Sequence, residues 1–339
     1  MDKKVILAVA GSGKTTHIVN SLNLDKKSLL ITYTNNNLFN LKNKIACKFG
    51  YMPDNISIYT YFTFLYNFCY KPFLWLEKMD RGVCWKMPPD WTFKVKRNSK
   101  EYYFDSYGQL YHNRLAKLLE VSKVLNDITQ RLEKYFDNIF IDEIQDFGGH
   151  DFDFLKVIVQ SSLDVLFVGD FYQHTFDTSR DGIINSKLYD DVEKYTHKLQ
   201  DMGLVVDCKT LNKSYRCSPT LCAFITNKLG IEIWSHRNQE TKIQMISDET
   251  EVSEKMDCNN TVKLFYQEHY KYKCFSRNWG ESKGEDDHVD VCVVLNKKTL
   301  DMYKKDQLHK LNPKTKNKLY VACSRAFGNV CFIPYNLVT

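Results

Sequence analysis

The chain has 339 residues, which is long enough for two domains that each bury a hydrophobic core. Hydrophobic residues make up 43% and charged residues 26%, and no apolar run approaches the roughly 18 residues of a membrane-spanning helix. These values exclude a transmembrane protein, and the net charge of +6 permits a polyanionic partner without requiring one. The first strand is expected within a few residues of Met1, which leaves no room for a signal peptide, so we expect a cytoplasmic protein.

The eleven cysteines are scattered along the chain, and no Cys-x-x-Cys pair occurs. Several of them lie in apolar runs that have the pattern of strands, such as Cys292 and Cys331. This distribution is typical of reduced, buried thiols in the cytosol, so we expect neither disulfides nor a metal site built from cysteines.

The N-terminal stretch has the pattern of a phosphate-binding loop. Residues 5–7 predict a buried strand and residues 14–22 a helix, and a glycine-rich segment joins them. Glycines allow backbone N–H groups to turn around an anion, and the helix N-terminus adds the positive end of its dipole. An ordinary glycine turn would not explain the strand before it and the helix after it. The residues predicted to bind nucleotide phosphates are Ala10, Gly11, Ser12, Gly13, Lys14, Thr15 and Thr16.

Strands and helices alternate through the first 70 residues. Residues 28–33 and 56–60 predict strands, whereas residues 38–49 and 61–68 have apolar side chains at helical spacing. This alternation predicts a parallel α/β sheet.

Residues 71–112 break the alternation and predict a small inserted subdomain. Lysines and an arginine separate its three tryptophans, and residues 101–111 have the pattern of a hairpin that turns at Asp105-Ser106. Two interpretations stay open. In one, the aromatic and basic side chains stack on and neutralise a nucleic-acid strand; in the other, they form a small aromatic core with a solvated basic face.

Acidic residues end the next predicted strands. A helix is expected over residues 115–136 and another over residues 152–160, with strands at 138–143 and 165–170. Ligands of open α/β sheets gather at the C-terminal ends of strands. Four side chains fall at such ends, and together they predict a nucleotide-hydrolysis site: Lys14, Asp142, Glu143 and Asp170.

The remainder predicts a second α/β unit. After a helix near residues 190–202, a helix at 219–229 and strands at 242–246, 289–295 and 329–333 are expected. The eight lysines of residues 296–318 predict a solvated helical surface. We therefore predict a first, ATP-binding domain at residues 1–210, which contains the insertion at about 71–112, and a second domain at residues 211–339.

Eight segments, taken in order, resemble the motifs of superfamily 1 helicases of the UvrD/Rep/PcrA type. Residues 8–15 are similar to A-x-A-G-S-G-K-T, 32–35 to T-F-T-N, 60–64 to T-F-H-S-F and 142–146 to D-E-x-Q-D. Residues 168–173 are similar to V-G-D-x-x-Q, 214–216 to N-Y-R, 282–284 to S/A-K-G and 320–326 to Y-V-A-x-[ST]-R-A. The resemblance implies two RecA-like parallel-sheet domains that hydrolyse ATP with Mg²⁺ in the cleft between them.

The resemblance also implies a role for each matching residue. Thr15 and Asp142 would hold Mg²⁺, Glu143 would polarise the attacking water, and Gln173 would sense the γ-phosphate. Arg216 and Arg325 would act as arginine fingers. The implied contacts to the nucleoside come from Tyr215, on the adenine, and from Gly284 and Asp286. The implied contacts to single-stranded DNA come from Tyr33, Asn35, Thr60 and Phe64, with Phe176 as a substitute for an absent tryptophan.

The chain departs from the family in three places. No helix with an adenine-reading glutamine precedes the first strand, the base-stacking tryptophan after Gln173 is absent, and the segment between Arg216 and Ser282 has room for core elements only. The ATPase motifs are thus more complete than the parts that engage DNA. A compact protein of this kind resembles the helicase-like subunit of Gabija-type antiphage systems, which accompanies an OLD-family nuclease.

Two functions follow as expectations. The first is an ATP-dependent DNA translocase or helicase that moves on single-stranded DNA, 3′ to 5′ by family likeness. The second is a regulatory, nucleic-acid-responsive ATPase subunit of an antiviral nuclease complex, with little unwinding activity. A phosphate-loop kinase or GTPase would leave residues 320–326 unexplained.

Overall fold

The computed structural model describes residues 2–175, 180–285 and 288–338. The chain divides into two compact units. The first consists of Met1–Ile6, Thr15–Gly169 and Asp177–Asp207, and the second of Leu7–Lys14, Asp170–Phe176 and Cys208–Thr339. The domain boundary near residue 210 stays a prediction. The second unit also includes two short segments that precede residue 210 in the sequence.

The first unit is built on a six-stranded sheet in the order β3-β2-β6-β7-β1-β8. Its central strands β2 and β6 are buried along their whole length, and β2 pairs in parallel with both β3 and β6. The strands are β1 (Lys3–Leu7), β2 (Ser28–Thr32), β3 (Ile56–Thr60), β6 (Asn138–Asp142), β7 (Asp164–Gly169) and β8 (Val205–Asp207). Continuous apolar runs such as 139–141 therefore form strands that are covered on both faces.

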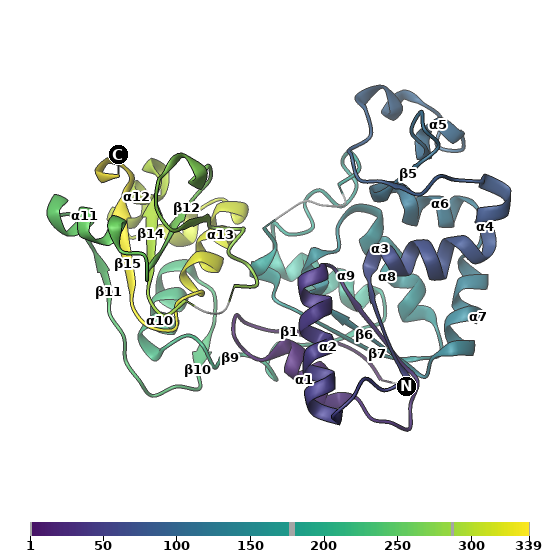
Figure 1. The fold of residues 1–339 in the computed structure, drawn as a ribbon, viewed down its shortest axis with the longest axis horizontal. Coiled ribbons are helices and arrows are strands. Elements are labelled where there is room, and N and C mark those ends of the chain that lie inside the picture. The colour runs from purple at the N-terminus through teal and green to yellow at the C-terminus, as the bar shows by residue number, and fades with distance from the viewer. Residues whose placement is uncertain (1, 176–179, 286–287, 339) are drawn as a thin grey trace. The chain divides into compact units, whose positions relative to one another are not determined.

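Helices connect and surround these strands (Figure 1). They are α1 (Lys14–Ser21), α2 (Asn35–Phe49), α3 (Tyr61–Thr63) with a π-helical continuation at Phe64–Tyr70, α4 (Lys71–Lys78), α6 (Leu115–Val121), α7 (Leu125–Tyr135), α8 (Gly149–Gln160) and α9 (Val192–Asp201). Helix α2 has clear end signals, because the Thr34 side chain accepts a hydrogen bond from the Asn37 N–H and Gly50 ends the helix in a left-handed conformation.

The prediction of one helix over residues 115–136 is wrong. The chain instead forms α6 and α7, which are separated at residues 122–124, where Lys123 has a φ of +59°. A left-handed residue interrupts the helical hydrogen-bond ladder, so the two apolar faces can turn separately toward the core.

The second unit is built on a five-stranded parallel sheet in the order β11-β15-β14-β12-β13. Its strands are β11 (Ile243–Met245), β12 (Val262–Phe265), β13 (Ser276–Asn278), β14 (Val291–Leu295) and β15 (Val330–Pro334). Its helices are α10 (Pro219–Phe224), continued as a π-helix at Ile225–Leu229, α11 (Glu249–Asp257), α12 (Lys297–Lys304) and α13 (Pro313–Cys323). Two short strands, β9 (Lys213–Ser214) and β10 (Trp234–Ser235), pair in parallel with each other and flank α10 in the sequence.

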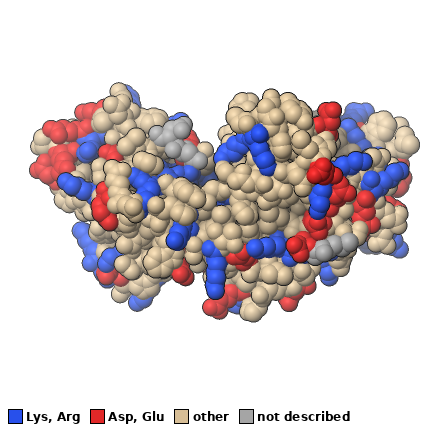
Figure 2. Space-filling view, turned by 90° about the horizontal axis from the view of Figure 1, so that it is seen from below, with Lys and Arg blue, Asp and Glu red and all other residues tan. Residues whose placement is uncertain are grey.

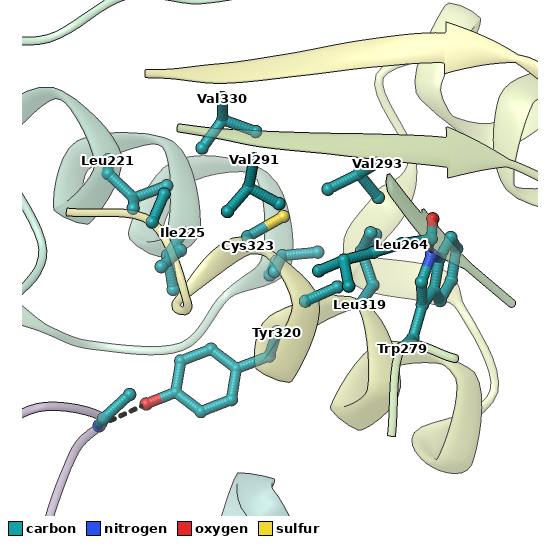
Figure 3. Packing of buried hydrophobic residues seen from close by; sticks show 14 of the residues in the cluster. Leu221, Ile225, Leu264, Trp279, Val291, Val293, Leu319, Tyr320, Cys323 and Val330 are labelled. Atoms are coloured by element: carbon teal, nitrogen blue, oxygen red, sulfur yellow. Dashed lines mark hydrogen bonds between the residues drawn. The ribbon is translucent and has the colours of Figure 1, made fainter. Parts of the chain in front are cut away.

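Alternate residues of this sheet bury opposite faces. Val291 and Val293 pack with α10 and α13 in one core cluster, in which Trp279 is fully buried (Figure 3). Cys292 and Val294 point to the other face and pack with Val252 of α11. The unit therefore has helices on both faces of a parallel sheet, as the alternating sequence pattern predicts.

The surface carries charges of both signs. On the face that Figure 2 displays, Lys and Arg side chains are interspersed with Asp and Glu side chains. The lysine-rich run forms α12 and α13 as expected, and Lys297 and Lys298 are exposed. Lys316 and Lys318 are half-buried and lie over the rings of Tyr172 and Tyr266, so their stems cover apolar surface.

None of the eleven cysteines, all of which lie in the described part of the chain, forms a disulfide, and most of them are buried. Among the residues described by the structure, none of the helices combines the length and the apolarity that crossing a bilayer requires.

The inserted segment contains α4, β4 (Val83–Cys84), α5 (Lys100–Tyr103) and β5 (Leu110–Tyr111). The predicted hairpin over residues 101–111 is wrong. The start of that segment is helical, a single antiparallel bridge joins Phe104 and Leu110, and β5 pairs in parallel with β4. Only the turn survives from the predicted hairpin: the Asp105 carboxylate accepts hydrogen bonds from the N–H groups of Tyr107 and Gln109.

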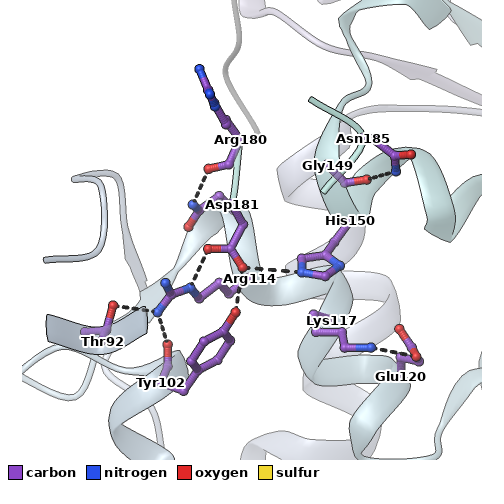
Figure 4. A network of polar contacts seen from close by, with 11 residues as sticks. Thr92, Tyr102, Arg114, Lys117, Glu120, Gly149, His150, Arg180, Asp181 and Asn185 are labelled. Atoms are coloured by element: carbon purple, nitrogen blue, oxygen red, sulfur yellow. Dashed lines mark hydrogen bonds and ion pairs between the residues drawn. The ribbon is translucent and has the colours of Figure 1, made fainter. Parts of the chain in front are cut away.

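A buried ion pair anchors this segment to the first unit (Figure 4). Arg114 Nε donates to Asp181 Oδ1 at 3.0 Å, and both side chains are at most 1% exposed. Arg114 Nη1 also donates to Thr92 Oγ1 and to the Tyr102 carbonyl, while the Tyr102 hydroxyl donates to Asp181 Oδ2 at 2.7 Å. Burial alone would raise the pKa of Asp181, but hydrogen bonds from His150 and Tyr102 and the Arg114 charge lower it below its usual value.

Candidate nucleotide site and nucleic-acid surface

The phosphate loop has the backbone shape that its glycines permit. Gly11 and Gly13 have φ values of +68° and +83°, which side chains with a Cβ rarely adopt. A Cβ at Gly11 would also lie 2.7 Å from Arg216 Cβ and from Ser214 Oγ. Glycine is therefore required at this position for two reasons: its backbone angle and the close approach of residues 214–216.

Residues 211–216 run alongside the phosphate loop within the second unit. The Val9 N–H donates to the Leu211 carbonyl at 3.0 Å, and the Tyr215 N–H donates to the Gly11 carbonyl at 2.8 Å. These two bonds fix the position of the segment that the family resemblance identifies as N-Y-R. Arg216, a predicted arginine finger, is thus held next to the loop by the backbone.

Two more groups of the loop are buried. Ser12 is 2% and Lys14 8% exposed, so both lie inside the fold rather than on its surface. Within the described part of the chain, the buried Ser12 Oγ has no hydrogen-bond partner. A buried hydroxyl in this state fits a loop that receives an external ligand with acceptor atoms.

Within the second unit, a tyrosine joins the phosphate loop to Asp170. The Ala10 N–H donates to Tyr320 Oη at 2.8 Å, and the Tyr320 hydroxyl donates to Asp170 Oδ2 at 2.9 Å. Figure 3 shows Tyr320 extending from α13 to the loop nitrogen. Burial and the Asp170 carboxylate raise the pKa of Tyr320 well above its usual value, so the hydroxyl keeps its proton.

Gln173 follows Asp170 on a turn of 3₁₀-helix at Phe171–Gln173. Its N–H donates to the Asp170 carbonyl at 2.9 Å, and its side chain is 4% exposed. The next residue, His174, accepts a hydrogen bond from Asn317 Nδ2 of α13 through its carbonyl. Helix α13 therefore holds this turn at two points, Asp170 and His174.

The predicted magnesium ligands lie together in the first unit. Thr15 Oγ1 donates to Asp142 Oδ2 at 2.8 Å, and Asp142 is 2% exposed. Glu143 follows in the left-handed conformation, with φ +61°, which is uncommon for a residue other than glycine and is concentrated at functional sites. This conformation turns the chain sharply where β6 ends.

Gln145 orients the Glu143 side chain. Its Nε2 donates to Glu143 Oε2, and Gln145 itself is fully buried. A Cβ at Gly169 would collide with the Gln145 side chain and with Ile144, so glycine at the end of β7 makes room for this pair. Gly169 and Gln145 are thus fitted to each other within the first unit.

The second predicted finger, Arg325, lies just beyond α13. It is 2% exposed, and its Nε and Nη1 donate to the carbonyls of Val321 and Glu285, each at 3.3 Å. Arg216 Nη1 donates to the Ser324 carbonyl at 3.1 Å. Arg216 is therefore bonded to the residue that directly precedes Arg325, the other predicted finger.

Tyr215 is one of the exposed residues among those predicted to bind the nucleotide. It is 61% exposed and stacks on His236, with ring centroids 4.0 Å apart and an interplanar angle of 11°. Thr16 Oγ1 accepts a hydrogen bond from Lys44, and Gly284 has a φ of +86°. Asp286 and Phe176 lie outside the described residues.

The predicted DNA contacts differ in exposure. Asn35 is exposed in the first turn of α2, and Thr60 is half-buried as the N-cap of α3. Tyr33 is half-buried and contacts the rings of Phe62 and Phe147. Phe64 is fully buried and stacks on Phe68, so its ring belongs to the core and does not reach the surface.

The motifs imply no role for two polar residues of these sites. Tyr320 opens the Y-V-A-C-S-R-A segment, and Gln145 lies inside D-E-I-Q-D. Both could have been selected as buried polar residues within motifs. Trp85 lies in the insertion, and no local pattern shows that its ring meets Phe62, 23 positions earlier.

No family model matches this chain, and no curated protein matches it in sequence. Among solved structures, the fold is similar to that of arterivirus nonstructural protein 10, a helicase whose structure was determined in complex with DNA. The TM-score is 0.50 at 12% sequence identity, and the match covers 97% of this chain and 60% of the viral chain. The α/β fold with two RecA-like parallel sheets is confirmed. This chain spans about 60% of the length of its helicase neighbour.

Proposed function

We propose that the chain is an ATP-dependent DNA translocase or helicase of the UvrD-like type, which moves on single-stranded DNA. The observation that carries the proposal is the 2.8 Å pairing of Thr15 Oγ1 with Asp142 Oδ2. A loop hydroxyl and a strand-end carboxylate are the protein ligands that phosphate-loop NTPases use for Mg²⁺. The fold shared with a helicase solved with DNA favours a motor over other NTPases.

The predicted site residues of each unit fit the chemistry of phosphoryl transfer. Thr15 and Asp142 would hold Mg²⁺, because both present hard oxygen ligands, and the ion would neutralise charge on the β- and γ-phosphates. Glu143, oriented by Gln145, would polarise the attacking water. Lys14 would contact the phosphates, and Arg216 and Arg325 would stabilise the charge that develops in the transition state.

The test is strand displacement and ATP turnover by the purified protein, with two variants. Glu143→Gln should still bind ATP while its turnover falls about 10²-fold or more, because only activation of the water is lost. Lys14→Ala should lose both hydrolysis and strand displacement. Strand displacement that persists in Lys14→Ala, or unchanged turnover in Glu143→Gln, would contradict the proposed site.

A second candidate is a regulatory ATPase subunit that senses nucleic acid and acts through a nuclease partner. It is favoured by the described residues 217–281, which are taken up by α10, β10, β11, α11, β12, β13 and their connections and include no separate large subdomain. Such a protein should hydrolyse ATP but displace strands poorly by itself. Robust unwinding by the isolated chain would rule out this second candidate.

A further inference from the structure

A row of three aromatic rings leads from the T-F-T-N-like segment to the inserted subdomain. The ring of Tyr33 meets that of Phe62 edge-on at 5.5 Å, and Phe62 meets Trp85 edge-on at 5.1 Å. Tyr33 follows β2 and Phe62 follows β3, so both lie at the C-terminal edge of the first sheet. Trp85 directly follows β4 of the insertion.

The outermost ring of this row, that of Trp85, packs on two buried rings and is also open to solvent. Trp85 is 63% exposed, whereas Phe62 and His112 beneath it are 8% and 7% exposed. His112 stacks on Trp85 with ring centroids 5.6 Å apart, and its Nδ1 lies 3.2 Å from the Cys84 carbonyl. The ring is therefore held in one orientation, although more than half of the residue remains exposed.

An exposed tryptophan contributes little to a hydrophobic core, so packing does not explain its placement. A rigid aromatic face offers a base a stacking surface at low entropic cost, and such stacking is tolerant of sequence. The next residue in the chain, Lys86, is also exposed and carries a positive charge. Aromatic and cationic side chains in this combination suit a single-stranded nucleic acid.

We propose that Trp85 stacks on a base of single-stranded DNA and so extends the DNA-binding surface from the sheet edge onto the inserted subdomain. The inference rests on the proposed function, since it assumes that the strand passes the Tyr33 and Thr60 segments. It assigns the stacking role to the insertion, whereas the loop after Gln173 lacks the family's tryptophan.

The test measures the dissociation constant of a short single-stranded oligonucleotide, by fluorescence anisotropy at several fixed salt concentrations. Trp85→Ala should weaken binding about tenfold, because stacking of one base contributes on the order of 1–3 kcal/mol. Trp85→Tyr should stay within about threefold of the parent protein, because it keeps a stacking ring. Trp91→Ala is the matched control: Trp91 is 54% exposed in the same subdomain, and its loss should leave binding unchanged.

Two further readouts separate stacking from other effects. Trp85→Ala should keep the salt dependence of binding, since no cation is lost, whereas Lys86→Ala should reduce the salt slope by about one. ATP hydrolysis without DNA should be unchanged in Trp85→Ala, which also shows that the variant is folded.

The experiment distinguishes a failure of the stacking role from a failure of the proposed function. If the parent protein binds the oligonucleotide and Trp85→Ala binds it equally well, the stacking role is overturned while the proposed function stands. Equal losses in Trp85→Ala and Trp91→Ala would also overturn it, because the row of rings would then have no special part. If the parent protein binds no single-stranded DNA, the proposed function and this inference both fail.

Discussion

The surroundings of the phosphate loop and the aromatic row on the insertion are built from opposite kinds of contact. Around the loop, buried polar groups meet through short hydrogen bonds, as in Thr15–Asp142 and Ala10–Tyr320–Asp170. Along the row, a half-buried ring, a buried ring and an exposed ring touch edge to face, and the exposed one, Trp85, faces solvent. Phosphoryl transfer needs fixed charges in a dry site, whereas a strand that must slide needs contacts that form and break without geometric precision.

The two regions should also differ in how well they tolerate substitutions. A buried donor or acceptor that loses its partner costs roughly 1–3 kcal/mol, so single changes near the loop should be severe. Replacing one aromatic side chain by another preserves most of a stacking surface, so substitutions along the row should weaken binding by degrees.

Arg325→Ala should lower kcat for ATP by about 10³-fold or more, with a much smaller change in KM, because a finger acts mainly in the transition state. Arg325→Lys keeps the charge without the planar donor fork and should recover only part of the turnover. Lys228→Ala, which removes an exposed cation of the same unit, is the control and should leave both constants unchanged. A pure KM effect in Arg325→Ala would remove this residue from the catalytic group.

Asp181→Asn should lower the free energy of unfolding by about 3 kcal/mol at neutral pH, because it breaks a buried ion pair and leaves Arg114 uncompensated. The pKa of Asp181 is lowered in the folded state, so its carboxylate stabilises the fold at pH values above about 4, the usual pKa of an unfolded aspartate. That stabilisation is lost as the pH falls through the folded pKa.

Denaturant unfolding between pH 7 and pH 3 measures both effects. The parent protein should lose stability toward pH 3 more steeply than Asp181→Asn does. Asp164→Asn, which removes a half-exposed pairing with Lys26, is the control and should change stability far less. Equal stability of the Asp181→Asn and parent proteins would show that the Arg114–Asp181 pair does not anchor the insertion that carries Trp85.

Tyr320→Phe should lower kcat about tenfold while KM for ATP changes less than threefold. The variant keeps the ring but takes a hydrogen-bond partner from Ala10 and from Asp170, which loosens the turn that positions Gln173. Tyr303→Phe removes a hydroxyl elsewhere in the same core and is the control. Steady-state kinetics referred to the folded fraction gives the answer, and an unchanged kcat would deny Tyr320 a positioning role.

Local signals predicted much of the fold correctly. The strands at residues 56–60 and 138–142 follow from continuous apolar runs, and α2 follows from its cap residues and its apolar spacing. The split between α6 and α7 could not be predicted, because Lys123 has no residue-type preference for the left-handed conformation it adopts. The parallel pairing of β4 with β5 joins residues far apart in the chain, whereas a hairpin pattern describes neighbours only.

The candidate site shows the same limit. The segments that hold Thr15, Asp142 and Glu143 could be recognised because their chemistry depends on spacing within a motif. Tyr320 and Ala10 are 310 positions apart, and nothing local to either residue indicates that they share a hydrogen bond. Phe64 matches its motif position, yet the fold places its ring in the core. Spacing therefore identifies chemical groups, whereas tertiary packing decides which of them reach a ligand.

The most direct test of the account is ATP hydrolysis by the purified protein, measured with and without single-stranded DNA and repeated with Arg325→Ala. The account predicts strong stimulation by DNA in the parent protein and its loss in the variant. Hydrolysis that is the same with and without DNA, or that survives in Arg325→Ala, would contradict the coupling of the phosphate loop to a DNA strand.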